Sequence, residues 1–183
     1  MEGKYGYAVF LPNVGYIDDN FITLGDQRST CLDNRALCPN GMTLSFWFKS
    51  SQQNQEYPSI LSSTTIGMYM KYRNGNLQLQ VSFPNDTHIE LYSDATMPMI
   101  TMETWHLLTF TYSGKKSKLY YDGCLVKTNP RFIRRGNRFR AFTLGCNKYG
   151  EAYFRNCPRN YYDDFRFWKT AKSPRFINWL WQN

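Results

Sequence analysis

Apolar and polar residues alternate along most of the chain, in runs that are rich in β-branched and aromatic side chains. Such a period of two is typical of half-buried β-strands, because neighbouring side chains of a strand point to opposite faces. The pattern predicts strands at residues 5–11, 16–24, 42–50, 59–64, 66–72, 77–83, 88–92, 105–112, 118–126, 140–145 and 161–168. Before residue 170 no segment has a convincing helical period, so we expect an all-β core.

Turn-forming residues separate these strands. RNGN at residues 73–76, SGKK at residues 113–116 and the dipeptide Asp122-Gly123 are hairpin signals, since Asn, Asp and Gly tolerate the positive φ of tight turns. About eleven short strands joined in this way predict an antiparallel two-sheet sandwich or jelly roll. The length of 183 residues fits one hydrophobic core, so we expect residues 1–183 to form a single domain.

The C-terminal end follows a different pattern. Ser173 can cap a helix whose first position is Pro174. Phe176, Trp179 and Leu180 follow at spacings that place them on one helix face. The sequence therefore predicts a short C-terminal helix that packs its apolar face on the edge of the sandwich.

Positive charge dominates the composition: 22 Lys and Arg stand against 14 Asp and Glu, a formal net charge of +8. This balance favours polyanionic partners, and nucleic acid among them would need exposed aromatic rings in a basic groove. No run reaches the roughly 18 apolar residues of a membrane-spanning helix. The first residues, MEGKYG, lack the apolar segment of a signal peptide. We expect no membrane span, and a domain that belongs to a longer chain.

Four of the five cysteines fall into two close pairs. Cys31 and Cys38 bracket a short loop without metal-type spacing, and Cys146 and Cys157 bracket a turn-bearing segment. We predict one disulfide within each pair, each contributing about 2 to 3 kcal/mol by constraining the unfolded chain. The alternative is a cytosolic protein in which all cysteines are reduced.

Asn85-Asp86-Thr87 is the one glycosylation sequon, and it lies between two predicted strands, where a glycan on Asn85 can be accommodated. Together with the cysteine pairs it indicates an extracellular or cell-surface setting, which argues against nucleic acid as a partner. The fifth cysteine, Cys124, directly follows the Asp122-Gly123 turn. Hairpin turns lie at the surface, so we expect this thiol to be partly exposed; the alternative is burial under the neighbouring arginine-rich loop.

Several motifs carry a family resemblance. GMTLSFWFKSS at residues 41–51, TWHLLTFTYSGKKSKLYYDGCLV at 104–126 and YYDDFRFWKTAKSP at 161–174 resemble, in order, laminin G-like domains of the concanavalin A-like jelly roll, and more loosely pentraxins. Residues 24–49 are similar to the version found in large modular cell-surface proteins of animals. The resemblance implies a non-catalytic recognition or adhesion module of a receptor or matrix protein, which binds proteins or acidic glycans beside other domains of its chain. The alternative is a carbohydrate-binding lectin domain.

The adjacent carboxylates Asp163 and Asp164 are the strongest catalytic candidates. Strand alternation predicts Asp163 on the core side with Phe165, and Asp164 on the other side with Arg166, so the two cannot flank one bond. The glutamates form no E-x-D-x-E pattern of a glycoside hydrolase, and His106 is expected to be a hydrogen-bonded structural residue. The sequence also contains no phosphate loop, zinc spacing or dinucleotide fingerprint. We therefore predict a protein that is not an enzyme and requires no cofactor.

Calcium is the cation that the resemblance implies, because many laminin G-like domains and pentraxins hold it at a loop rim with carboxylate and carbonyl oxygens. The candidate ligands are Asp18, Asp19 and Asp26, with Asn20, Asp33 and Asn34 nearby in the sequence. The segment 50–59, where the pentraxin pattern supplies Asp-Asn ligands, contains no Asp. Solvated turn residues are therefore the alternative.

A basic segment at residues 129–140, NPRFIRRGNRFR, is the second candidate site. Its arginines are Arg131, Arg134, Arg135, Arg138 and Arg140. Arginine binds sulfate and carboxylate groups through two parallel hydrogen bonds, so the cluster predicts a site for sulfated or acidic glycans. The alternative is a solvated loop that binds only counter-ions.

Trp47 and Trp105 lie in predicted strands, and we expect both in the core.

Overall fold

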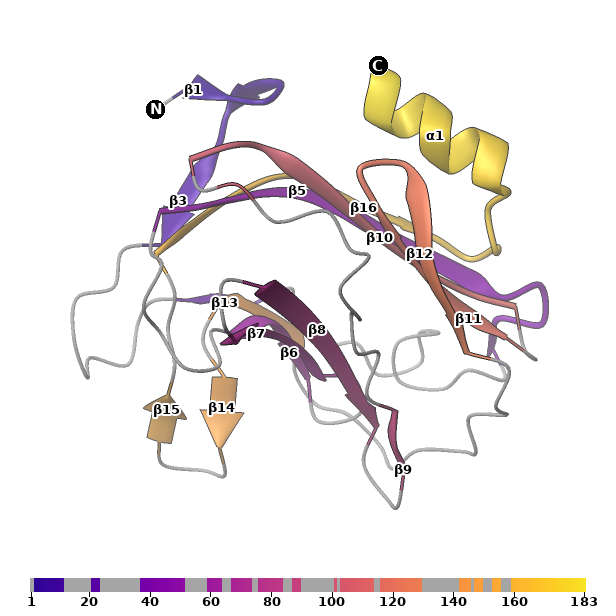
Figure 1. Ribbon diagram of the computed structural model, residues 1–183, viewed down its shortest axis with the longest axis horizontal. Helices are drawn as coiled ribbons and strands as arrows, with labels where there is room; N and C mark the ends of the chain where they lie inside the picture. Colours follow the sequence, from indigo (N-terminus) through magenta and orange to yellow (C-terminus); the bar gives the residue numbers. More distant parts are fainter. Residues whose placement is uncertain are drawn as a thin grey trace.

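Two stacked β-sheets form the protein, with a helix on the outer side of one of them (Figure 1). A computed structural model describes residues 2–11, 21–23, 37–51, 59–63, 67–73, 76–83, 87–89, 101, 103–113, 116–129, 142–145, 147–149, 153–155 and 159–183. Among these residues, no helix has the length and apolar character that crossing a membrane requires.

The first sheet has six antiparallel strands in the order β12-β11-β10-β5-β16-β3. They are β3 (Val9–Leu11), β5 (Met42–Ser50), β10 (His106–Tyr112), β11 (Ser117–Tyr121), β12 (Cys124–Asn129) and β16 (Asn160–Trp168). The second sheet has the order β4-β13-β6-β7-β8-β9. Its strands are β4 (Phe21–Thr23), β6 (Ser59–Ser63), β7 (Gly67–Arg73), β8 (Asn76–Phe83), β9 (Thr87–Ile89) and β13 (Phe142–Gly145). The predicted antiparallel sandwich is confirmed.

Two small hairpins accompany the sheets. The first pairs β1 (Glu2–Gly3) with β2 (Gly6–Tyr7), and the second pairs β14 (Asn147–Tyr149) with β15 (Tyr153–Arg155). The predicted hairpin turn at Asp122-Gly123 is also present, between β11 and β12. Asp122 has a φ of 48°, the left-handed conformation that Asp tolerates better than most residues. The predicted strand 118–126 is therefore two strands joined by this turn.

The outer face of the first sheet is covered over its central strands and only partly covered at β16. Trp47, Leu107 and Leu180 form a buried cluster there, with exposed fractions of 1%, 3% and 5%. Leu180 belongs to α1 (Pro174–Gln182), and both α1 and the β1–β2 hairpin lie on the side of the sheet that faces away from the second sheet (Figure 1). The helix thus packs over the face of the sheet, whereas we expected it at the edge.

The helix begins as predicted, with the side chain of Ser173 accepting the backbone N–H of Phe176 and with Pro174 in the first turn. Its buried side chains are Ile177 and Leu180, however, and Trp179 is 51% exposed. The prediction that Trp179 faces the sandwich is wrong. Two residues correspond to about 200° around a helix, so a helix that buries Ile177 must turn Trp179 outward.

The inner face of the first sheet carries the main core. Since Trp47 points outward, its neighbours Phe46 and Phe48 point toward the second sheet, and they are 1% and 0% exposed. The register places Leu108 opposite Phe46 and Phe110 opposite Leu44. Each large side chain buried in this way stabilises the fold by about 1.5 to 3 kcal/mol.

A β-bulge interrupts the alternation of β16. Asp163 pairs with Trp47 and Arg166 pairs with Ser45, so three steps along β16 oppose two steps along β5. Asp164 occupies the extra position with a φ of 49°. Phe165 consequently packs on the inner side, 6.1 Å from the ring of Phe46, and Asp163 lies on the outer side. The prediction that Asp163 faces the core together with Phe165 is wrong, because it assumed an unbroken strand.

Candidate functional site

Most of the predicted site residues lie outside the described part of the chain. This holds for the five arginines of 131–140, for Asp18, Asp19 and Asp26, and for Asn85, Cys31, Cys146 and Cys157. Cys38 is described; it is buried and disulfide-bonded, while the identity of its partner stays a prediction. Within the described segments, no group of three or more His, Cys, Asp or Glu side chains could hold a metal ion.

The two adjacent carboxylates of β16 are engaged in structural bonds. Asp163 accepts the backbone N–H of Tyr5 at 2.9 Å with one oxygen and that of Asp164 at 2.7 Å with the other. Asp164 accepts a hydrogen bond from Nε of Arg166 at 2.6 Å. Both carboxylates are therefore occupied, one holding the N-terminal segment on the sheet and the other stabilising the bulge.

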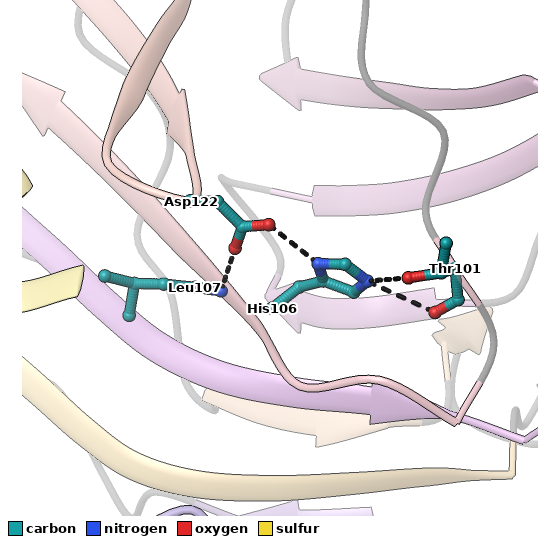
Figure 2. Close-up of polar contacts among 4 residues, drawn as sticks. All are labelled: Thr101, His106, Leu107 and Asp122. Carbon is teal, nitrogen blue, oxygen red and sulfur yellow. Dashed lines mark hydrogen bonds and ion pairs between the residues drawn. The ribbon is translucent and has the colours of Figure 1, made fainter. Parts of the chain in front are cut away.

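His106 lies at the start of β10, buried between the sheets with 5% of its surface exposed. Figure 2 shows its ring between two polar partners. Nδ1 lies 2.8 Å from Oδ2 of Asp122, and Nε2 lies 3.1 Å from the hydroxyl and 3.2 Å from the carbonyl oxygen of Thr101. The carboxylate of Asp122 can only accept, so Nδ1 donates to it. The ring also stacks on Tyr121, with 4.9 Å between centroids.

The second oxygen of Asp122 accepts the backbone N–H of Leu107 at 2.8 Å (Figure 2). The amide of Asp122 in turn donates to the carbonyl oxygen of Leu107 at 2.9 Å. One carboxylate thus joins the β11–β12 turn to β10, and His106 extends the connection to residue 101. This arrangement is the hydrogen-bonded structural role that the sequence predicted for His106.

The outer face of the first sheet carries a group of lysines over aromatic rings. Nζ of Lys49 lies 4.4 Å from the ring centroid of Tyr161 and 5.6 Å from that of Trp105. Phe10 stacks on the same Tyr161, with 4.5 Å between centroids. A cation at such distances is attracted to the ring by about 0.5 to 1 kcal/mol at partly exposed sites.

Two further lysines repeat this contact on the same face. Nζ of Lys4 lies 4.6 Å from the ring centroid of Trp47. Nζ of Lys172 lies 4.9 Å from the ring centroid of Phe176 and 5.7 Å from that of Trp168. We call Lys4, Lys49 and Lys172 the outer-face lysines. They come from the β1–β2 turn, from β5 and from the segment before α1, which are the elements that build or cover this side of the sheet.

Sequence reasoning missed the outer-face lysines. Alternation alone indicates that Lys49 shares a face with Trp47, two residues before it, but nothing in the sequence places Lys4 and Lys172 on that face. The expectation that Trp47 is a core residue is confirmed, with 1% of its surface exposed; Trp105 is only half-buried.

Tyr5 is 45% exposed and packs edge-on against Trp47. The pKa of its phenol is raised, first by partial burial and second by the negative charge of Asp164.

Residues 24–178 match the family model Laminin G 3, described as the concanavalin A-like lectin/glucanases superfamily. The chain belongs to this superfamily. Membership confirms the predicted concanavalin A-like relationship and agrees with the observed sandwich. A search of curated proteins finds no match.

Solved structures of similar fold include two sugar-bound domains and a pentraxin. Domain 4 of AbnA, an extracellular arabinanase from Geobacillus stearothermophilus in complex with arabinotriose, has a TM-score of 0.62 and 16% identity, covering 98% of this chain and 79% of that one. The ligand-binding domain of botulinum neurotoxin serotype D in complex with N-acetylneuraminic acid has a TM-score of 0.59 and 16% identity, with coverages of 91% and 38%. A pentraxin from Limulus polyphemus has a TM-score of 0.59 and 14% identity, with coverages of 76% and 68%. At these identities the likeness concerns the fold.

Proposed function

We propose that this domain is a non-catalytic carbohydrate-binding module of an extracellular or cell-surface protein. The observation that carries the proposal is the outer face of the first sheet, where three lysine ammonium groups are held over aromatic rings. Ammonium groups donate hydrogen bonds to hydroxyl, carboxylate or sulfate oxygens of a sugar. The ring of Tyr5, 45% exposed beside them, offers apolar surface to the C–H groups of a sugar.

The family and two structural neighbours support this reading. The superfamily includes lectins and glucanases, and the structures of the arabinanase domain and the botulinum domain are complexes with arabinotriose and N-acetylneuraminic acid. Hydrolysis of a glycosidic bond needs two carboxyl groups that flank it. The bonds of Asp163 and Asp164 to backbone N–H groups and to Arg166 favour the binding role over the hydrolytic one.

A protein-binding adhesion module, as in modular receptors of animals, is the second candidate. Large exposed side chains favour it: Tyr7 of β2 is 91% exposed, and Trp179 and Trp181 of α1 are 51% and 40% exposed. Aromatic side chains are enriched in protein interfaces.

Three further sites remain proposals beside either function. They are a polyanion site at the arginines of 131–140, a calcium site at Asp18, Asp19 and Asp26, and a glycan on Asn85.

An array of neutral, carboxylated and sulfated glycans tests the first candidate. Saturable binding that the same free glycan competes away is the expected result. Silence on every glycan class, at protein concentrations where the fold is intact by circular dichroism, would overturn the carbohydrate-binding proposal and leave the adhesion module. Release of reducing ends from a bound glycan would contradict the non-catalytic assignment.

A further inference from the structure

We propose that the outer face of the first sheet binds a linear anionic glycan, whose sulfate or carboxylate groups contact the outer-face lysines. This inference rests on the proposed carbohydrate-binding function and specifies its ligand class and its location. The location is distinct from the arginines of 131–140, which lie outside the described residues.

The outer-face lysines follow the course of β5. Lys4 lies over the ring of Trp47, which is two residues before Lys49 in this strand. Lys172 lies over Trp168, whose partner in β5 is Thr43. A strand advances about 3.3 Å per residue, so the lysine positions are distributed along about 20 Å of the face. A row of cations of this length suits a chain with repeated anionic groups better than a compact ligand.

The carboxylates of this face, Asp163 and Asp164, form no ion pair with the outer-face lysines in the described part of the chain. Asp163 keeps its negative charge, because its two partners are neutral backbone N–H groups, and Asp164 is paired with Arg166, so the three lysines outnumber the one carboxylate without a cationic partner. The remaining described carboxylates likewise form no ion pair with an outer-face lysine. The register adds Lys118, which pairs with the outer residue Thr111 in β10. The face therefore retains an excess of positive charge that is complementary to sulfate and carboxylate groups.

The backbone of each outer-face lysine is anchored. Lys49 is part of a central strand. The N–H of Lys172 donates to the hydroxyl of Thr43 at 2.8 Å, and that hydroxyl donates to the carbonyl oxygen of Thr170 at 2.8 Å. Lys4 precedes Tyr5, whose N–H is held by Asp163. Side chains that are positioned before binding lose less conformational entropy when a ligand arrives, which raises affinity.

A glycan fits this face better than a single-stranded nucleic acid, which shares its negative charge. Sequence-tolerant binding of single strands relies on bases that stack on free aromatic rings. Phe10 and Lys49 already contact the ring of Tyr161, and Trp47 is only 1% exposed. The rings of Tyr161 and Trp47 thus offer little free surface for stacking, whereas the ammonium groups above them suit sulfate and carboxylate oxygens.

The test measures the affinity of the full chain for a length series of heparin oligosaccharides by titration calorimetry at several salt concentrations. The triple variant Lys4→Gln, Lys49→Gln, Lys172→Gln should bind about ten- to a hundredfold more weakly, because three partly exposed ion contacts are lost. The salt dependence should also become shallower, since fewer counter-ions are released on binding. The affinity of the unaltered chain should rise with oligosaccharide length until about 20 Å is spanned.

Matched variants keep the outcome interpretable. Lys116→Gln, Lys127→Gln, Lys169→Gln removes the same charge from three lysines without a described ring contact and should bind like the unaltered chain. Lys4→Arg, Lys49→Arg, Lys172→Arg keeps the cations and should retain binding, which separates loss of charge from loss of fold. Equal weakening of both glutamine variants, or equal affinity for single-stranded DNA, would show a non-specific polyanion surface and overturn the inference. If the outer-face glutamine variant binds glycans as tightly as the unaltered chain, this inference is overturned but the proposed function stands. If the unaltered chain binds no glycan at all, the proposed function is overturned.

Discussion

Asp122 joins His106 and the backbone of Leu107 through one carboxylate, with distances of 2.8 Å from Oδ2 to the imidazole Nδ1 and 2.8 Å from Oδ1 to the amide nitrogen. Both bonds reach from a two-residue hairpin turn to the neighbouring strand β10. His106 is 5% exposed, so a missing partner would leave a buried N–H group unsatisfied. Such groups cost more when left unpaired than their bonds contribute when made.

We therefore expect Asp122→Ala to lower the free energy of unfolding by about 2 to 4 kcal/mol, from the two lost bonds and from placing Ala at positive φ. Asp122→Asn keeps an acceptor for one of the two N–H groups and tolerates the left-handed conformation, so it should cost about 1 kcal/mol. Urea denaturation of both variants checks this order. Equal stability of the two variants would mean that the carboxylate does not hold the turn to β10.

Gly41 precedes β5 with a φ of 80°, and a Cβ there would lie 2.0 Å from the carbonyl oxygen of Tyr112. We expect Gly41→Ala to destabilise the fold by more than about 3 kcal/mol, because the obstructing atom is backbone. Gly6 is the matched control, with a φ of 116° and no atom within 4 Å of its Cβ position. Gly6→Ala should cost only the backbone strain, about 1 to 2 kcal/mol. Similar melting temperatures for the two variants would contradict the close approach at Gly41.

Tyr162 is buried on the inner side, and burial raises the pKa of its phenol well above its ordinary value of 10.0, although a hydrogen bond from Asn160 lowers it slightly. The native state then holds the proton at a pH where the unfolded chain releases it. Its contribution to stability is complete below pH 10 and declines above it, by at most about 1.4 kcal/mol per pH unit. Tyr162→Phe should make unfolding free energies between pH 9 and about 11 less dependent on pH. Burial also raises the pKa of Tyr120, so part of the slope should persist; an unchanged slope in Tyr162→Phe would contradict the assignment.

Cys124 is a free, exposed cysteine at the start of β12, as the sequence predicted. We expect a thiol reagent to modify it rapidly in the native protein, without denaturant. Cys124→Ser should abolish this labelling and change the unfolding free energy by less than about 0.5 kcal/mol, because the side chain is exposed. Buried, disulfide-bonded Cys38 should contribute no thiol. Labelling only after denaturation would show that the thiol is protected.

The fold class could be predicted because alternation is strong where the strands are long. β5 was predicted at residues 42–50 and is observed at Met42–Ser50. β14 and β15, three residues each, are too short to show a period and were missed. The face of α1 was assigned only in part, since a stripe through Phe176 and Leu180 is compatible with burial of either Ile177 or Trp179. The choice depends on the sheet beneath the helix.

The candidate site could not be predicted, because its members are distant in sequence. Lys4, Lys49 and Lys172 reach one face only when the β1–β2 hairpin and the segment before α1 fold back over the first sheet. Local patterns instead drew attention to the arginines of 129–140, which adjoin one another in the sequence. Charge patterning along a chain detects contiguous clusters and overlooks those assembled by topology.

The bulge at Asp164 also determines how this strand should be aligned with its relatives. Residues before and after it obey the same two-residue repeat, but the second half is shifted by one position. A relative whose equivalent strand lacks the bulge must be aligned with a one-residue gap at Asp164; without it, Phe165 would be matched to an outward-facing position and Arg166 to an inward-facing one. Homology models and designed chimeras that join β16 to another sandwich should therefore transfer residues 163–166 as a unit.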